Sequence, residues 1–386
     1  MGPDFMEDKP TNGATPGESL TLLHDTDADD GADATFTRVI QCMDAAEKTI
    51  EIHMFVWRND AIGNEIGKAA LRAATRGVKV KIKKDRGAIL YERIEMNRKS
   101  FFHTALPLTT RLKHTILRPT FPNTFVEDDF QSDFGDEVRN HPNVDLTWVD
   151  HTHTKYYLFD ETILITGSIN IEDRHRQYHD YMVEISGADL IDRFRRRPSR
   201  ESSYRAERPI DFLVNCRNAS PPVFEIKNQL MRFIAEAQHA IYVEMAYIGD
   251  PDISRRLIAA TRHGVRVTVL FSRKANIGND INYRALRDLY EKAEIRVHLS
   301  DKMLHSKLML FDWKTAFLGS ANVSVFSMQK ADELNISVHS QPAFLKEINA
   351  EVKRRLASSE RIDSVKPLKK YSRVLASLQQ LHQRLT

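Results

Sequence analysis

The chain has 386 residues but only two cysteines, Cys42 and Cys216. Two thiols form one disulfide at most, which excludes a disulfide framework and a cysteine-rich zinc site. The sequence also lacks any run of about 18 apolar residues, which argues against a membrane-spanning helix. Charge of one sign is missing too, because 56 Lys and Arg stand against 53 Asp and Glu. Bulk charge therefore does not mark a nucleic-acid binder.

What the sequence has is enough apolar material for a large core, since 41% of its residues are hydrophobic. This length predicts two or three domains or one large duplicated unit. The first five residues, followed by Met6, resemble a remnant of an expression vector rather than a signal peptide. With its many aspartates and no apolar periodicity, the segment 1–34 is predicted to be a disordered acidic leader.

An internal repeat organises the rest of the chain. Residues 45–54 align with 236–245, and each stretch is typical of an amphipathic helix leading into an apolar strand. A second helix is expected over 63–74 and over 253–261, and each is followed by a glycine and alternating valines that begin another strand. The order helix–strand–helix–strand in each copy predicts an α/β fold with parallel, buried strands.

A sharper pattern also occurs twice. It reads His-x-Lys-x4-Asp, followed after six residues by Gly-Ser-x-Asn. The first copy consists of His153, Lys155, Asp160, Ser168 and Asn170, and the second of His305, Lys307, Asp312, Ser320 and Asn322. Strand pairs are predicted at 156–159 with 162–166 and at 308–311 with 315–318. Side chains alternate along a strand, so the histidine and lysine of each copy share one face.

Together the two copies supply what reaction at a phosphodiester requires. One histidine attacks phosphorus to give a covalent phosphohistidine, and the other protonates the departing alcohol and later acts as the base. The pattern does not decide which histidine has which role. The lysines and asparagines would hold the nonbridging oxygens, so no metal and no cofactor is expected.

Acidic residues near the motifs have two predicted roles. Asp180 and Glu333 follow the asparagines by ten or eleven residues and are expected to hold each histidine in one tautomer. Asp160 and Asp312 stand next to the turn between the hairpin strands and are interpreted as structural. Ser168 and Ser320 are expected to support the site.

The doubled motif resembles the phospholipase D superfamily. Its surroundings, including residues 52–63, 76–80 and 167–180, are most similar to bacterial cardiolipin synthase-like phosphatidyltransferases. The resemblance implies two similar α/β/α sandwich halves related by pseudo-twofold symmetry, one shared site and phosphatidyl transfer to an alcohol. The expected division is a leader at 1–34, a first half at 35–192, an Arg-rich linker at 193–222, a second half at 223–345 and a basic amphipathic C-terminal helix region at 346–386.

The acceptor stays open: an alcohol or, in a phospholipase D, water. A less favoured alternative is a two-motif phosphodiesterase or nuclease that acts on nucleic acid. The expected partners are a phospholipid substrate and the anionic surface of a membrane, at a cytoplasmic or peripheral inner-membrane location in a bacterium. The first copy is longer by about 35 residues within 86–145, and this apolar and basic insertion is either a packed excursion or a lid. The linker and the C-terminal region are each either structural or in contact with an anionic surface.

Overall fold

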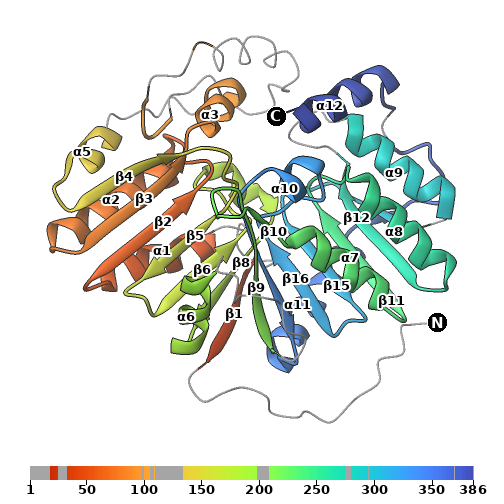
Figure 1. Ribbon diagram of the computed structural model, residues 1–386, viewed down its shortest axis with the longest axis horizontal. Coiled ribbons are helices and arrows are strands. Elements are labelled where there is room, and N and C mark those ends of the chain that lie inside the picture. The colour runs from red at the N-terminus through yellow and green to blue at the C-terminus, as the bar shows by residue number, and fades with distance from the viewer. Residues whose placement is uncertain are drawn as a thin grey trace.

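The computed structural model describes residues 18–24, 33–96, 100–104, 108, 134–197, 208–273, 280–293, 295–368 and 370–385. These residues form two mixed sheets that lie side by side, each with helices on its outer face (Figure 1). The strand order is β1-β8-β6-β5-β2-β3-β4 in the first sheet and β10-β9-β17-β16-β15-β11-β12-β13-β18 in the second. The predicted two-part α/β fold is confirmed.

The first half runs through the following elements. They are β1 (Ser19–His24), α1 (Asp33–Ala45), β2 (Thr49–Met54), α2 (Ala61–Thr75), β3 (Lys79–Asp85), α3 (Ala88–Met96), α5 (Phe134–Asn140), β4 (Val144–Val149), β5 (Tyr156–Phe159), β6 (Ile163–Gly167), the 3-10 helix η2 (Asp173–Gln177), β7 (Tyr178–His179), β8 (Tyr181–Ser186) and α6 (Ala188–Arg196).

The second half has a similar order, with a short strand added near its start (β10) and further elements at its end. Its elements are β9 (Ile210–Cys216), β10 (Val223–Phe224), α7 (Ile226–Glu236), β11 (Ala240–Met245), α8 (Pro251–Arg262), β12 (Arg266–Ser272), α9 (Asp280–Ala293), β13 (Arg296–Ser300), β14 (Met303–Leu304), β15 (Lys307–Phe311), β16 (Thr315–Gly319), α10 (Val325–Gln329), β17 (Glu333–His339), α11 (Pro342–Ala357), β18 (Glu360–Arg361) and α12 (Arg373–Leu385).

The expectation of parallel strands holds for only part of each sheet. β2, β3 and β4 are parallel, as are β11, β12 and β13, because a helical segment connects each strand to the next. The motif hairpins β5–β6 and β15–β16 join these parallel strands antiparallel, and β8 and β17 continue in the same sense. A tight turn can only produce an antiparallel pair, so each sheet is mixed.

Three apolar cores hold the layers together. One lies between the first sheet and α1 and α2, and another lies between the second sheet and α7, α8 and α9. The third is shared by both halves: Leu158 and Phe194 of the first half belong to it with Leu308 and Ile336 of the second. The two sheets therefore bury their inner faces against each other, which keeps the halves in one relative position.

The predicted disordered leader is wrong for its last part. Ser19–His24 forms the edge strand β1, paired antiparallel with β8 from Ser19–Ser186 to His24–Tyr181. Leu22 is buried in the shared core, and Leu20 packs against it. Apolar residues at alternating positions are the signal of such a strand, but here they stand within a polar, acidic context.

The expected linker is also partly folded. α6 extends through Arg196, and β9 pairs with β17 inside the second sheet. Arg193 donates to the backbone oxygen of Ile210 at 2.6 Å. The segment 193–222 is therefore mostly part of the two halves, while residues 198–207 lie outside the described residues.

The C-terminal region is not one helix. α11 and α12 are separate, and β18 adds an edge strand to the second sheet between them. Leu368 is buried in the second core, and Tyr371 packs against that core. Of the helices that the structure describes, none is both long and apolar enough to cross a bilayer.

The described part of the insertion is packed. Phe101 stacks on Trp57 with ring centroids 5.2 Å apart, and Phe102 meets the same indole edge-on at 5.1 Å. Both phenylalanines are buried, whereas Leu108 is 79% exposed. Some of the residues that gave the insertion its apolar and basic character lie outside the described residues, namely Leu106, Ile116, Leu117, Phe121, Phe125, Arg111, Lys113 and Arg118.

Asp160 and Asp312 have the structural kind of role that was predicted. They do not fix the turn of their own hairpin, however, but bind the backbone at the start of a neighbouring strand. The Asp160 carboxylate accepts backbone N–H bonds from Glu47, Lys48 and Thr49 at 2.7–2.8 Å, at the start of β2. Asp312 accepts the equivalent three bonds from residues 238–240, before β11. Each acid ties its motif hairpin to the beginning of the neighbouring strand.

We expect Asp160→Ala and Asp312→Ala each to lower the free energy of unfolding by about 1–2 kcal/mol, because three backbone donors lose their acceptor. Urea titration followed by circular dichroism measures this. Asp145→Ala, at an exposed position of β4, is the control and should stay within about 0.5 kcal/mol of the unchanged protein. Equal stability of all three variants would contradict the assigned role.

Candidate active site

The two motif histidines stand at the start of the motif hairpins, on the inner side of the two halves. Lys155 immediately precedes β5 and Lys307 is the first residue of β15. The side chains of both lysines are fully buried, and those of His153 and His305 are only 13% and 8% exposed. The four groups therefore lie in a largely dry environment, where charges act strongly on each other.

Backbone hydrogen bonds cross between the halves at both histidines. The His153 N–H donates to the oxygen of Asp332 at 2.8 Å, and the Asp332 N–H donates to the oxygen of His151 at 2.8 Å. On the other side β14 pairs in parallel with β7, and the His305 N–H donates to the oxygen of His179 at 3.0 Å. These bonds place His153 beside Glu333, the residue after Asp332, and His305 beside Asp180, the residue after His179.

Those following residues are the two predicted acids. His153 Nδ1 lies 3.1 Å from both carboxylate oxygens of Glu333, and His305 Nδ1 lies 2.9 Å from Asp180 Oδ2. The pairs are crossed, since the acid of each half orients the histidine of the other. With Nδ1 facing the acid, the Nε2 atom of each ring is the one left for substrate.

The Gly-Ser pair of each motif brings a hydroxyl to each acid. Ser320 Oγ donates to Glu333 at 2.5 Å, and Ser168 Oγ donates to Asp180. A Cβ atom at Gly167 would lie 2.4 Å from the oxygen of Tyr181. Only glycine permits this close approach of β6 to β8, which sets the serine against the acid.

Both acids are ionised. Burial by itself would raise their pKa values, but His305 and His175 hold the pKa of Asp180 well below its usual range, and His153 and Lys155 lower the pKa of Glu333. Burial lowers the pKa of His153 to about 4, and burial together with the charge of Lys307 places the pKa of His305 well below its usual value. Both rings are therefore neutral near pH 7, as attack on phosphorus requires.

The two lysines are close to losing their charge. Burial lowers the pKa of Lys155 to about 8 and that of Lys307 to about 7. The negative charges of Asp180 and Glu333, one from each half, oppose this decrease at both lysines. Lys155 Nζ donates to the backbone oxygen of His153 at 2.7 Å, and Lys307 Nζ donates to that of His305 at 2.5 Å. Residues of both motifs thus share one electrostatic site.

The asparagines occupy equivalent places but differ in their contacts. Asn170 Oδ1 accepts from the backbone of Val56 at 3.3 Å, and its amide nitrogen lies 3.4 Å from His175 Nε2. Asn322 is also buried, and its Oδ1 makes no hydrogen bond with the described residues. Its amide oxygen is therefore a buried acceptor without a hydrogen-bond partner among the described residues.

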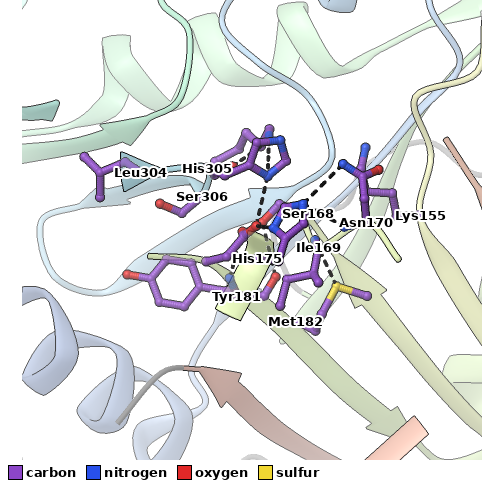
Figure 2. A network of polar contacts seen from close by, with 12 residues as sticks. Lys155, Ser168, Ile169, Asn170, His175, Tyr181, Met182, Leu304, His305 and Ser306 are labelled. Atoms are coloured by element: carbon purple, nitrogen blue, oxygen red, sulfur yellow. Dashed lines mark hydrogen bonds and ion pairs between the residues drawn. The ribbon is translucent and has the colours of Figure 1, made fainter. Parts of the chain in front are cut away.

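Two residues in the site were not predicted. Phe55 meets the His153 ring edge-on at 4.9 Å and lies under Lys155 Nζ at 5.3 Å. His175 is fully buried beside His305 and Asn170 (Figure 2). Comparison of the two copies hides His175, because Ser327 stands five residues after Asn322, where His175 stands five residues after Asn170.

Among the described residues, one group of side chains has ligand atoms close enough for a metal ion. His175, Asp180 and His305 bring three such atoms within 4.8 Å of one another. However, Lys307 Nζ lies 3.1 Å from His305 Nε2, and an ammonium group beside the ring opposes a second cation. The donor set therefore does not suit a metal.

The protein therefore belongs to the class of duplicated α/β proteins in which two similar halves form one site between them, here with crossed histidine–acid pairs. The family model described as "Cardiolipin synthase, PLD-like domain" matches residues 39–200 and 230–356. The chain therefore belongs to the PLD-like domain family of cardiolipin synthase. This membership confirms the predicted resemblance to the phospholipase D superfamily, a family of phosphatidyltransferases and phosphodiesterases.

Curated relatives are distant but extensive. The chain is 22% identical over 337 residues to cardiolipin synthase 1 of Bacillus anthracis, covering 77% of this chain and 60% of that protein. It is 21% identical over 329 residues to cardiolipin synthase B of Escherichia coli K12, covering 79% of this chain and 74% of that protein. The chain thus spans about 60% of the length of the first of these relatives.

Solved structures share the fold. Phosphatidylserine synthase of Haemophilus influenzae Rd KW20 matches with a TM-score of 0.65 and 14% identity, over 95% of this chain and 93% of that one. Polyphosphate kinase of Porphyromonas gingivalis matches with a TM-score of 0.57 and 15% identity, over 99% of this chain and 57% of that one. Both likenesses extend over both halves.

The lysine pKa values predict how an oxyanion binds. Tungstate, a dianionic phosphate mimic, should bind at least about tenfold more weakly at about pH 9 than at about pH 6.5, because both lysines lose their protons in this interval. Isothermal titration calorimetry measures the affinity.

Lys307→Met should weaken binding at the lower pH and flatten the remaining pH dependence. Lys346→Met, on α11 at an exposed position, is the matched control and should follow the unchanged protein. An affinity that is constant over this interval would contradict the assignment of the lysines to the oxyanion.

Proposed function

We propose that this chain transfers a phosphatidyl group from a phospholipid to an alcohol through a covalent phosphohistidine. The observation that carries the proposal is the crossed pairing of His153 with Glu333 and of His305 with Asp180. Each histidine has its acid on Nδ1, so one ring can act as the neutral nucleophile and the other, once protonated beside the bound phosphodiester, as the proton carrier.

In the first step, Nε2 of one histidine attacks phosphorus and the bond to the leaving alcohol breaks. The other histidine takes up a proton from solvent when the negatively charged phosphodiester binds beside it and raises its pKa, and it gives this proton to the leaving oxygen. Lys155 and Lys307 face the nonbridging oxygens and offset their charge, and Asn170 and Asn322 donate amide N–H groups. The acid on the nucleophile's Nδ1 stabilises the positive charge that develops on that ring.

In the second step, the acceptor alcohol reacts. The histidine that lost its proton removes the hydroxyl proton of the acceptor, whose oxygen attacks phosphorus. The P–N bond breaks and the free histidine is restored, so each group returns to its starting state. Water in place of the alcohol would yield phosphatidic acid by the same atoms.

A lipid substrate is favoured by aromatic side chains around the histidines. Phe55 contacts both His153 and Tyr91, with ring centroids 4.9 Å and 5.6 Å apart respectively. On the opposite side, Phe326 lies 6.5 Å from His151. The three aromatic side chains are only partly buried, and apolar surface beside a phosphate-binding centre suits a glycerolipid. The cardiolipin synthase relatives support the same substrate class.

His153→Ala and His305→Ala should each reduce transfer by at least about 10³-fold, since the proposed reaction needs one of these histidines as the nucleophile and the other as the proton carrier. The measurement is product formation from labelled phosphatidylglycerol by thin-layer chromatography. His239→Ala, at an exposed position before β11, should keep full activity. Appreciable turnover by either catalytic variant would disprove the shared site.

The acceptor is identified by the product. With glycerol added, labelled phosphatidylglycerol should enter a transfer product; release of phosphatidic acid alone would identify a hydrolase. Cleavage of single-stranded DNA with inert lipid would identify a nuclease. A chelator should leave the rate unchanged, because the lysines neutralise the phosphate charge.

We also propose that α12 contacts an anionic membrane surface. Val374, Leu375 and Leu378 are 69%, 49% and 57% exposed along its outer side, while Ala376 is buried. Lys366, Lys370 and Arg373 are exposed next to them. α12 packs against α9 and α10, and α10 begins three residues after Asn322 (Figure 1). An apolar ridge flanked by basic side chains near the site suits interfacial binding to acidic lipid.

Replacing Val374, Leu375 and Leu378 together by serine should weaken binding to vesicles containing phosphatidylglycerol by about tenfold or more, because three apolar side chains are lost from the contact. Vesicle cosedimentation measures it. Ser377→Gln on the same helix is the control. Unchanged binding of the triple variant would exclude α12 as the contact.

A further inference from the structure

The two halves of the site differ behind their acids. On the second-half side, Glu333 receives His153 and Ser320. On the first-half side, Asp180 Oδ2 lies 2.9 Å from His305 Nδ1 and also 2.9 Å from His175 Nδ1. One carboxylate oxygen is thus shared by two imidazoles. At the corresponding place in the other copy, Ser327 belongs to α10, and its N–H contacts Ser324 Oγ rather than Glu333.

Further contacts fix the orientation of the His175 ring. Its Nε2 lies 3.0 Å from Glu172 Oε1, and the backbone N–H of Asn170 donates to the same Nε2 at 3.3 Å. Glu172 in turn pairs with Arg58 and with Arg174, and all of these side chains are buried. The ring therefore has carboxylates on both of its nitrogens and is not free to turn.

The protonation of the ring follows from these neighbours. If the ring is neutral, Nε2 accepts from Asn170 and the proton is on Nδ1, which faces Asp180. If the ring is charged, both nitrogens carry protons. In either state the protonated Nδ1 of His175 is the ring atom that lies 2.9 Å from Asp180 Oδ2.

Asp180 has close polar contacts on both of its oxygens. Oδ2 accepts a hydrogen bond from His305 Nδ1 and lies at the ion-pair distance of 2.9 Å from His175 Nδ1, while Oδ1 accepts from Ser168 Oγ and, at 2.9 Å, from the Tyr181 backbone N–H. Three donors and the His175 ring therefore surround the carboxylate. These contacts restrict its rotation.

We propose that His175 is a positioning residue that fixes the Asp180 carboxylate on His305. It makes the pair of His305 with Asp180 more rigid than the pair of His153 with Glu333. Its ring centroid is 4.6 Å from that of His305, with the rings nearly perpendicular (Figure 2). This contact keeps His305 in the tautomer that has Nδ1–H on Asp180 and an unprotonated Nε2, which lies 3.1 Å from Lys307 Nζ.

Asn and Gln substitutions separate the two ring nitrogens. His175→Asn keeps an amide N–H near the position of Nδ1, facing Asp180, whereas His175→Gln keeps one near the position of Nε2, facing Glu172. We expect His175→Asn to retain kcat within about threefold and His175→Gln to lose about 10–100-fold in kcat with little change in KM. Ser327→Ala, at the equivalent place in the second half, should match the unchanged protein.

The kinetic comparison, measured as phosphatidyl transfer, rests on the proposed function. Equal losses in both variants with a lowered Tm would indicate a packing role and overturn the inference, as would unchanged kcat in both. A pH–rate profile adds a further criterion: His175→Gln should move the limb that reports His305. The ionisable groups that face His175 or its direct partners are Glu172, Asp180, His305, Tyr178, Arg58, Arg174 and Lys307.

A second measurement does not depend on the substrate. In protein labelled with ¹⁵N-histidine, His305 signals are assigned through His305→Ala and should show a single Nδ1–H tautomer in the unchanged protein and in His175→Asn. His175→Gln should show a mixture of tautomers at His305, with His153 signals unchanged. A single unaltered tautomer in His175→Gln would overturn the inference even if the lipid assay succeeds. Failure of the lipid assay alone would overturn only the proposed function.

Discussion

The site depends on the backbone hydrogen bonds that the halves exchange at its centre. The chain at His151–His153 bonds Asp332, and the chain at His305 bonds His179. Because Glu333 and Asp180 are the next residues, these bonds alone decide which acid meets which histidine. The shared apolar core behind them prevents the sheets from sliding. A displacement of one half by a single strand residue would turn both acids away from their histidines. The relative position of the halves therefore determines whether the histidine–acid pairs form.

Crossed pairing also explains why several charged groups are stable in the buried site, because each has a partner there. Two lysines, two carboxylates and two histidines lie together with little solvent exposure, and a lone buried charge would be costly. Each carboxylate has a histidine from the other half on one side and a serine from its own half on the other. Separated, each half would keep the serine beside its acid but lose the histidine that the other half provides. The halves therefore compensate each other electrostatically, and the duplication is needed for stability as well as for chemistry.

The sequence predicted the repeat, the hairpins and the residues of the site, because the spacing of a motif along a strand is a local property. The crossed pairing could not be predicted, since it arises from contacts between halves that no local pattern contains. β1 was missed because the acidic context around Leu20 and Leu22 outweighed their alternation. The leader, linker and tail boundaries were wrong for a related reason: β9 and β18 become strands only when a sheet edge is available to pair with them.

His175 marks the limit of reasoning from symmetry. If the two copies were identical, their histidines would have identical surroundings, and nothing in the site would assign one of them as the nucleophile and the other as the acid. In this chain the histidine, lysine, serine and asparagine of the motif are kept in both halves, while the residues behind the acids differ: η2 places His175 beside Asp180, and Ser327 of α10 stands at the corresponding position of the other half. The proposed two-step transfer requires one histidine to hold phosphorus while the other carries the proton. Divergence behind the acids distinguishes the two histidines without altering the motif residues proposed to contact the substrate.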